Sequence, residues 1–426
     1  MDVVINHSGD NWSYPGGFNY NYSNDQQFDF GSWRRADRPL PVELRNPDLY
    51  HRRGDMGNYD SYPENQHGDM VGLKDYANDD DKFGSEVLNI LIKAHSYWIR
   101  EADIDGFRVD AIKHMGELAC SIFCSNIREY AYSLGKRGFF LFGELAQPGD
   151  DILDRYIGQN TSRQDGNNTV FFGIDSVLDF PLAEGRFNDS THRPLRDVLK
   201  GNADPESLFN RLEAQRRRAL NRGEIDRYLV TFVDNHDTFW QPGRFSAGAT
   251  DQQTIAAIGY LLCALGTPCI YYGTEQGFSG TGGDNDVREA MFDAATAGKN
   301  LLNPDCTIYV EIAKIAQVVR ATPALRFGRM YFRPISGDAI HFGMPYGTQY
   351  TLAFSRLVFG SEVLVAFNIS GAARNDALVV DASLHKVGDL LTYLYGGSGT
   401  IPVQQSPDGT RFVQLPLTAH QFVILK

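Results

Sequence analysis

Short apolar runs rich in β-branched and aromatic residues alternate with long amphipathic stretches up to about residue 327. This alternation is typical of a parallel sheet whose strands are joined by helices. The strands are predicted at residues 2–6, 106–109, 139–142, 176–180, 228–233 and 267–273. Two stretches predict helices with one apolar stripe, the first carried by Val87, Ile90, Leu91, Ala94 and Trp98 and the second by Ile308, Ile312, Ile315 and Val319.

The regular pattern is interrupted once and ends before the chain does. From about residue 8 to 72 the sequence is rich in aromatic residues, Gly, Asn and Asp and has no helical period. After about residue 327 short alternating runs with Gly, Asp and Ser turns predict antiparallel strands. We therefore expect a (β/α) domain over residues 1–328, an inserted domain at about 8–72, and an all-β domain over 329–426.

Composition and charge narrow the kind of partner. Of the 426 residues, 42% are hydrophobic and 22% are charged, which is an ordinary globular composition. The formal net charge of −13 argues against nucleic acid or an anionic membrane as partner, whereas a neutral sugar is compatible with it. No apolar run approaches the roughly 20 residues that span a bilayer. Cys120 and Cys124, two of five cysteines, lie four apart on one face of a predicted helix and are expected in the protein core rather than at a metal site.

Four polar clusters come directly after predicted strands. The carboxyl ends of the parallel strands carry the active-site loops of a (β/α) barrel, so the placement of the clusters points to one shared site. Each cluster alone is weak, but four in order are a strong signal. They are Asp2-Val-Val-Ile-Asn6-His7, Asp105-Gly-Phe-Arg108-Val-Asp110-Ala-Ile-Lys113-His114, Phe142-Gly-Glu144 and Phe232-Val-Asp234-Asn235-His236-Asp237.

Together these clusters resemble the signature regions of the α-amylase superfamily of glycoside hydrolases. Stretches 72–75 and 266–275 match as well, and the resemblance runs to about Gly328 and more loosely beyond. It implies an α/β fold, a (β/α)8 TIM barrel with a loop domain inserted after its third strand and a C-terminal antiparallel β-sandwich. The first cluster, which ends the family's third strand, begins here at residue 2. We therefore expect an N-terminally incomplete barrel without its first two βα units or a signal peptide, and localisation stays open.

The chemistry of glycosidic cleavage explains why carboxyl groups are needed. A poor leaving group must be protonated while an oxocarbenium-like centre forms, which takes two carboxyl groups in different states. Arg108 and Asp110 lie two apart and share one face of a strand, so the guanidinium keeps this carboxylate ionised, as a nucleophile requires. Glu144 follows an apolar run that favours a protonated carboxyl group, as a general acid requires. We expect these two carboxyl groups about 5 to 5.5 Å apart, the separation of retaining enzymes.

The resemblance assigns the remaining site residues. Asp237 is the third catalytic carboxylate, which holds sugar hydroxyls and supports the transition state. The expected substrate-binding residues are His7, Arg108, Lys113, His114 and His236. Each assignment has a simpler alternative: Asp110 and Arg108 as a structural ion pair, Glu144 as the acid at a helix N-terminus, and Asp237 as a cap of the turn at Thr238.

The resemblance also implies a structural calcium ion. Its expected ligands are the side chains of Asn6 and Asp75 and the backbone carbonyl of His114, with another ligand from residues 59–69. Oxygen ligands of this kind suit calcium. Lys74 stands where the family often has proline, which loosens this part of the match. The simpler alternative is that Asn6 and Asp75 only bond loop backbone.

The pair Lys113-His114 resembles the α-amylase type and favours an α-1,4-glucan substrate. The rivals are an α-glucan transferase of the same superfamily, in which a sugar hydroxyl replaces water, and a non-catalytic barrel subunit. The presence of all three carboxylates weighs against the latter. Trp12, Tyr14, Phe18 and Tyr22 are expected either to stack on sugar rings or to pack the inserted domain. The oligomeric state is open.

Overall fold

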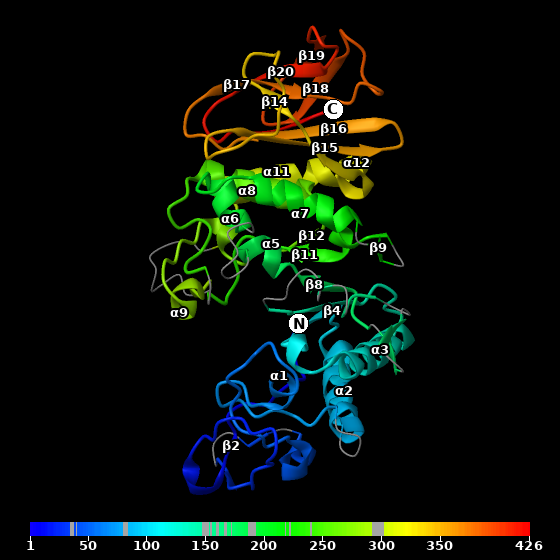
Figure 1. Ribbon diagram of the computed structural model, residues 1–426, viewed down its shortest axis with the longest axis vertical. Helices are drawn as coiled ribbons and strands as arrows, with labels where there is room; N and C mark the ends of the chain where they lie inside the picture. The colour runs from blue at the N-terminus through cyan, green and yellow to red at the C-terminus, as the bar shows by residue number, and fades with distance from the viewer. Residues whose placement is uncertain are drawn as a thin grey trace. The chain divides into compact units, whose positions relative to one another are not determined.

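The computed structural model describes residues 1–34, 38–39, 41–79, 84–146, 153, 156–158, 162–165, 168–171, 173–185, 193–217, 219–220, 223–238, 241–291 and 302–426. The chain forms two compact units, Met1–Leu178 and Asp179–Lys426 (Figure 1). Among the described residues, no helix combines the length and apolar character needed to cross a membrane.

The first unit contains four parallel strands. In the order in which they lie side by side, these are β1 (Asp2–Val4), β4 (Gly106–Asp110), β5 (Phe140–Gly143) and β8 (Ser176–Leu178). Crossover helices α2 (Gly84–Glu101) and α3 (Glu117–Ser133) precede β4 and β5. Parallel neighbours need such connections, so the predicted strand–helix alternation is confirmed in this unit. A hairpin of β6 (Ser162–Asp165) and β7 (Asn168–Phe171) precedes β8.

The register of β4 against its neighbours positions the later chemistry. Arg108 lies opposite Asp2 of β1, and Val109 lies opposite Gly143 of β5. Phe107 and Val109 alternate with the polar residues of β4 and are fully buried, as is Leu141 of β5. Because side chains alternate along a strand, Arg108 and Asp110 share the opposite face, as the sequence predicts.

One part of the predicted stripe on α2 is wrong. Val87 and Leu91 are buried, but Trp98 is 48% exposed and contacts Tyr97 in a T-shaped ring pair. The last buried residue of α2 is Ile99 instead. On α3, Cys120 and Cys124 are both buried, in agreement with their expected place in the core.

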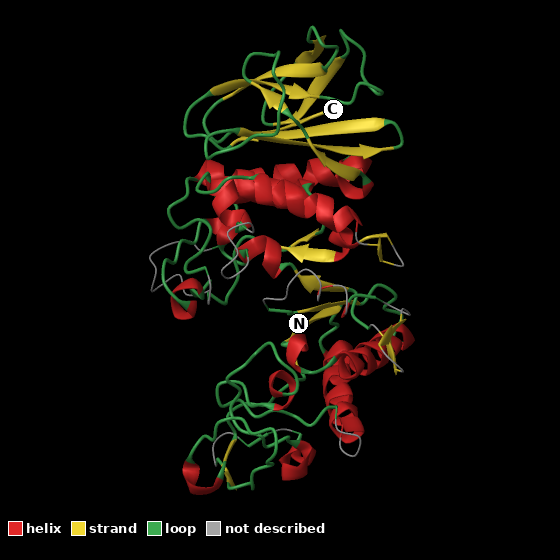
Figure 2. Ribbon diagram, viewed as in Figure 1, coloured by secondary structure: helices red, strands yellow, loops and turns green. Residues whose placement is uncertain are grey.

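The segment between β1 and α2 is built mostly of loops and turns (Figure 2). Its core is aromatic: Trp12, Tyr14 and Tyr50 are fully buried, and Trp12 packs edge-on against both tyrosines. Packing is therefore the role of Trp12 and Tyr14, whereas Phe18 is 69% exposed. The regular elements are the pair β2 (Trp12–Ser13) and β3 (Ser32–Trp33), η1 (Pro15–Gly17), η2 (Val42–Arg45), η3 (Pro47–Leu49) and α1 (Glu64–His67).

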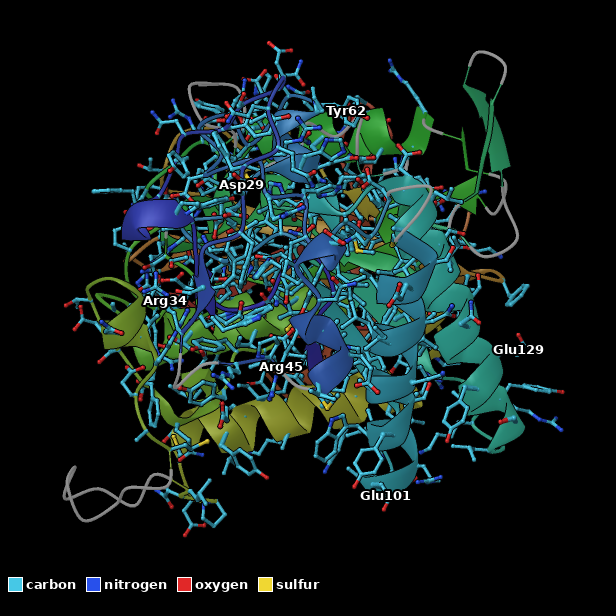
Figure 3. All side chains as sticks on the ribbon, turned by 90° about the horizontal axis from the view of Figure 1, so that it is seen from below. Asp29, Arg34, Arg45, Tyr62, Glu101 and Glu129 are labelled. Carbon is cyan, nitrogen blue, oxygen red and sulfur yellow. The ribbon has the colours of Figure 1, made fainter. Side chains whose placement is uncertain are left out.

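Lys74 occupies the centre of this aromatic core. Its side chain is fully buried, its ammonium group lies 2.9 Å from Asp69 Oδ2, and the same group lies over the rings of Trp12 and Tyr14. Tyr14 donates a hydrogen bond to the same carboxylate oxygen. A buried charge is tolerated when it is paired and hydrogen-bonded. Outward-facing side chains of this segment, such as Arg34 and Tyr62, can be followed in Figure 3.

The second unit begins with helices and a short parallel strand pair. Strand β11 (Leu229–Thr231) pairs in parallel with β12 (Thr267–Pro268). Helix α8 (Asp251–Cys263) connects them and starts at a capping box formed by Thr250 and Gln253. The other elements before residue 329 are α5 (Phe180–Glu184), α6 (Leu195–Lys200), α7 (Glu206–Arg217), β9 (Ala219–Leu220), β10 (Gly223–Glu224), η5 (Ile225–Tyr228), η6 (Thr274–Gln276), α9 (Asp284–Val287), α11 (Thr307–Ala321) and α12 (Pro323–Phe327).

An antiparallel sheet ends the chain, as predicted. Its strands are β13 (Arg329–Phe332), β14 (Ile335–Ser336), β15 (Thr351–Val358), β16 (Ser361–Asn368), β17 (Arg374–Val379), β18 (Leu390–Tyr395), β19 (Thr400–Gln405), β20 (Arg411–Leu417) and β21 (Phe422–Leu425). The pairing runs without interruption in the order β13-β15-β16-β21-β18-β19-β20-β17-β14. One face of β15 and β16 packs on α8, where Tyr260 meets Phe354 edge-on. The other face encloses a separate aliphatic core.

Candidate active site

Asp110 is the last residue of β4, and Glu144 directly follows the neighbouring parallel strand β5 at the same level. The amide of Glu144 donates to the carbonyl of Val109, and the amide of Ile112 donates to the carbonyl of Glu144. Neighbouring strands lie about 4.8 Å apart, so the two carboxyl groups leave the sheet side by side. The expected separation of these groups is consistent with this register and stays a prediction.

Arg108 joins the two carboxylates. Its guanidinium donates to Asp110 Oδ1, lies 3.2 Å from Glu144 Oε2, and donates to Asp2 Oδ1 at 2.9 Å. The Arg108 side chain is only 11% exposed. A shared planar cation holds both carboxylates in a set orientation, so the contact is more than an isolated ion pair between Arg108 and Asp110.

The turn after Asp110 adds a second restraint on Glu144. Ala111 adopts a left-handed backbone conformation with φ of +50°, which is uncommon for a residue other than glycine. In this conformation its amide donates a 3.1 Å hydrogen bond to Glu144 Oε2. The Ile112 side chain fills the space above Gly143, where any added Cβ would lie 2.3 Å from Ile112 Cδ1. Glycine before Glu144 therefore lets the turn close onto β5.

Burial favours the neutral form of two histidines of the first unit. Burial lowers the pKa of His7, although the charge of Asp110 opposes the shift. Burial lowers the pKa of His114 to about 4. The Nδ1 atom of His114 lies 2.7 Å from the carbonyl oxygen of Asn65. Lys113 is also largely buried, and its ammonium group donates to Asp60 and to the carbonyl of Ala146. The predicted contacts of Lys113 and His114 with sugar stay predictions.

His236 and Asp237 belong to the second unit. His236 Nε2 lies 3.1 Å from Asp237 Oδ2, and Arg288 donates to Asp237 Oδ1 at 2.9 Å. The amide of Asp237 donates to Asn235 Oδ1 at 2.5 Å. The simpler alternative, that Asp237 caps the turn at Thr238, is wrong. The amide and the hydroxyl group of Thr238 both donate to Asp284 instead.

Two residues around Asp237 lie outside the sequence motifs. Arg288 follows Asp237 by 51 residues and pairs with its carboxylate. Glu184, at the end of α5, accepts a 3.1 Å hydrogen bond from Asn235 Nδ2, and burial raises the pKa of Glu184 to about 7. Neither contact has a local sequence signal, because each joins segments that are distant in the chain.

Three buried oxygen atoms in the first unit are suited to a cation. Within the described part of the chain, Asn6 Oδ1, Asp75 Oδ1 and Asn65 Oδ1 are buried without a hydrogen-bond partner. The backbone brings two of them together, since the amide of Tyr76 donates to the carbonyl of Asn6 and His7 pairs with Asp75. Asn65 lies within residues 59–69, the span expected to supply another ligand. Its backbone carbonyl oxygen contacts Nδ1 of His114. Unpaired buried carboxylate and amide oxygens are costly, so these residues fit a hard cation.

Comparisons with known proteins show the family to which the chain belongs. Residues 1–303 match the family described as "Alpha amylase, catalytic domain". An α-amylase of Streptomyces lividans is 27% identical over all of this chain and 47% of its own length. A cyclomaltodextrin glucanotransferase of Bacillus sp. (strain 1-1) is 27% identical over 82% of this chain and 40% of its own length. The chain thus spans about half or less of these curated relatives.

Solved structures show the same fold. An α-amylase from Anoxybacillus matches all of this chain and 74% of its own chain, with a TM-score of 0.66 and 22% identity. An α-amylase from Geobacillus thermoleovorans, complexed with acarbose, matches all of this chain and 76% of its own, with a TM-score of 0.65 and 21% identity. At such identities the likeness concerns the fold alone.

Proposed function

The chain belongs to the α-amylase family, and from this premise we propose that it cleaves α-1,4-glucosidic bonds of starch-type or maltodextrin-type glucans with retention of configuration. The observation that carries the proposal is the shared contact of Arg108 with Asp110 and Glu144 at the ends of adjacent strands. The relatives named above include one called an α-amylase and one called a cyclomaltodextrin glucanotransferase.

The reaction proceeds in two displacements. In the first, an Asp110 oxygen forms a bond to the anomeric carbon while Glu144 gives its proton to the departing glycosidic oxygen. In the second, Glu144 takes a proton from water, and the resulting hydroxide breaks the bond between Asp110 and the sugar. Asp237 and the neutral His7 bond the sugar hydroxyls, with His236 on the same ring. Lys113 and His114 hold the sugar on the leaving-group side.

Incubation of the chain with maltoheptaose tests this function. Because two inversions give net retention, the first reducing ends released are expected in the α configuration, as observed by proton NMR before mutarotation. Shorter oligosaccharides alone indicate hydrolysis, and products longer than the substrate indicate the transferase alternative. Release of β anomers, or absence of any cleavage, would count against the proposal. The latter result would favour the non-catalytic alternative.

The proposed architecture is a (β/α) TIM barrel followed by a separate antiparallel domain at 329–426. Parallel strands with helical crossovers support the barrel, because the predicted clusters all follow strands at their carboxyl ends. The long segment between β1 and α2 corresponds to the inserted domain at about 8–72. The continuous antiparallel sheet supports the C-terminal domain.

We propose calcium as a structural ion held by Asn6, Asp75 and the carbonyl of His114, with Asn65 as the further ligand. Burial raises the pKa of Asp75 to about 8, and its hydrogen bond to His51 opposes this rise. A bound divalent ion would supply positive charge and join the first strand to the inserted segment. It takes no part in the two displacements.

Calcium is expected to raise the melting temperature of the chain. An ion that binds only the folded state stabilises it by mass action, by about 2.7 kcal/mol at a hundredfold excess over its dissociation constant. Asn6→Ala should abolish the calcium-dependent shift, and the exposed replacement Asn126→Ala on α3 serves as the matched control. Identical melting curves of the wild-type chain in calcium and in excess chelator would contradict the site.

A further inference from the structure

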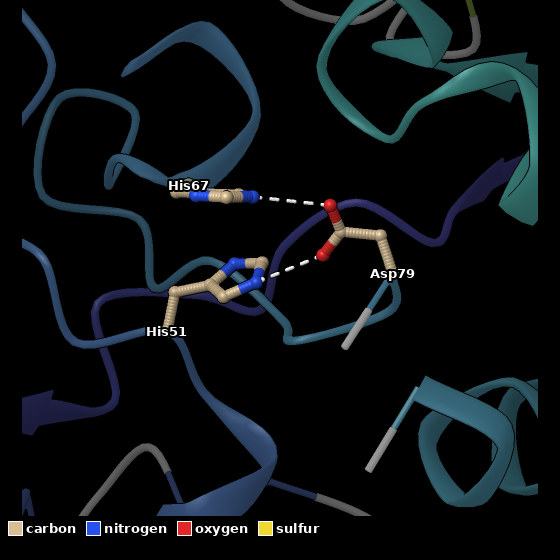
Figure 4. A group of neighbouring side chains, drawn as sticks. All are labelled: His51, His67 and Asp79. Carbon is tan, nitrogen blue, oxygen red and sulfur yellow. Dashed lines mark hydrogen bonds and ion pairs between the residues drawn. The ribbon is translucent and has the colours of Figure 1, made fainter. Parts of the chain in front are cut away.

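Two histidines and an aspartate meet in the segment between β1 and α2 (Figure 4). His51 Nε2 lies 2.9 Å from Asp79 Oδ1, and His67 Nε2 lies 3.1 Å from Asp79 Oδ2. One ligand atom from each residue lies within 4.8 Å of the other two. None of these residues belongs to the catalytic clusters or to the proposed calcium ligands.

The three side chains come from separate pieces of the fold. His51 follows η3, His67 is the last residue of α1, and Asp79 lies shortly before α2. The two imidazole rings lie with centroids 4.4 Å apart and their planes inclined by 37°, and both present a nitrogen to the same carboxylate (Figure 4). The side chains are 10%, 20% and 27% exposed, respectively, so each of the three is partly accessible to solvent.

A second carboxylate orients the more buried ring. His51 Nδ1 lies 2.5 Å from Asp75 Oδ2 while its other nitrogen faces Asp79. A carboxylate on the far nitrogen is the usual support of a metal-binding histidine, because it fixes which nitrogen carries the proton. Asp75 offers a different oxygen, Oδ1, to the proposed calcium site. The two functions of Asp75 therefore do not compete for one atom.

We propose that His51, His67 and Asp79 form a second metal site, which binds a zinc-type divalent cation. Two imidazole nitrogens and one carboxylate oxygen suit zinc, whereas calcium prefers an all-oxygen shell. Ligand atoms of tetrahedral zinc lie roughly 3.3 Å apart, close to the two observed nitrogen–oxygen separations. Water completes the four ligands.

Metal binding replaces protons in this arrangement. Without metal, hydrogens on the two Nε2 atoms bridge to the Asp79 carboxylate. When zinc binds, His51 releases its Nε2 proton to solvent and keeps the Nδ1 hydrogen on Asp75, while His67 gives up its Nε2 hydrogen to solvent, takes one on Nδ1 in exchange and binds through Nε2. The ion then ties the end of η3, α1 and the start of α2 together. It stabilises the inserted segment without touching the catalytic carboxylates.

Titration of the full chain with zinc chloride, in saturating calcium, tests the proposal. One equivalent should bind, and His67→Ala should weaken its affinity by about 100-fold or more, since a direct ligand is lost. His341→Ala, which removes an exposed histidine paired with Asp338, is the matched control and should bind as wild type does. Asn6→Ala should also retain zinc binding, which separates this site from the calcium site.

Binding of cobalt(II), followed by its visible absorption, is a second test of the same site. Bound cobalt should show the intense visible absorption of a tetrahedral nitrogen and oxygen site, and Asp79→Asn or His67→Gln should weaken or remove it. Absence of stoichiometric zinc binding by the wild-type chain would overturn the proposal without any variant. Equal zinc affinity in the wild type and in a folded His67→Ala variant would overturn it too. His51, His67 and Asp79 would then form only a hydrogen-bonded cluster.

Discussion

Replacement of Asp110 by asparagine is expected to reduce turnover of maltoheptaose on the order of 10⁴-fold or more. The amide keeps the size of the side chain and accepts a hydrogen bond from Arg108, but it carries no negative charge to attack the anomeric carbon. Glu144→Gln and Asp237→Asn should each cause a similarly large loss, since each removes a different transition-state interaction. Initial rates and circular dichroism of each variant are the measurements.

A substrate with a better leaving group distinguishes the role of Asp110 from that of Glu144. An α-glucosyl fluoride needs no protonation of its leaving group, so Glu144→Gln should retain a rapid first step with this substrate, whereas Asp110→Asn should not. Asp338→Asn, an exposed carboxylate of the C-terminal region, serves as the control and should keep full activity. Turnover close to wild type in any of the three active-site variants would show that its role is misassigned.

Arg108→Lys is expected to lower kcat/KM by about 100-fold or more. The guanidinium contacts Asp2 and Asp110 through Nη1 and Glu144 through Nη2, and a lysine ammonium is a single point charge that cannot reproduce this fork. Arg108→Met removes the charge altogether and leaves two mostly buried carboxylates side by side. It should lower the free energy of unfolding by about 3 kcal/mol, as measured by chemical denaturation.

The control for Arg108 is another arginine in an ion pair. Arg34 pairs with Asp10 where both side chains are more than 40% exposed. Such exposed pairs contribute little, so Arg34→Lys should change neither activity nor stability measurably. If Arg108→Lys behaved in the same way, the shared guanidinium would have no part in catalysis.

Local sequence patterns were enough to predict the parallel strands and to place Arg108, Asp110 and Glu144 at the carboxyl ends of two of them. Alternation along β4 places Arg108 and Asp110 on one face, and a motif at the end of β5 places Glu144 beside them. Strand limits were less accurate. Strand β12 covers only Thr267–Pro268 instead of 267–273, because the chain turns towards η6 after Cys269.

Contacts between distant segments could not be predicted in this way. Lys74 has a long charged side chain, yet it is fully buried because Asp69 and two aromatic rings surround it. Arg288 reaches Asp237 from a loop after β12. His51, His67 and Asp79 have no metal-binding spacing in sequence, since the meeting of their side chains depends on the path of an irregular segment. In each case the contact depends on tertiary packing, which the helical or strand periodicity of the local sequence does not reveal.

Mass spectrometry of a trapped reaction intermediate tests the two-displacement mechanism most directly. The Glu144→Gln variant, treated with an α-glucosyl fluoride and digested after rapid acid quenching, should yield a peptide that is heavier by one glucosyl group at Asp110, because the second displacement lacks its base. A glucosyl group on another residue, or no covalent adduct together with release of the inverted sugar, would contradict retention through Asp110.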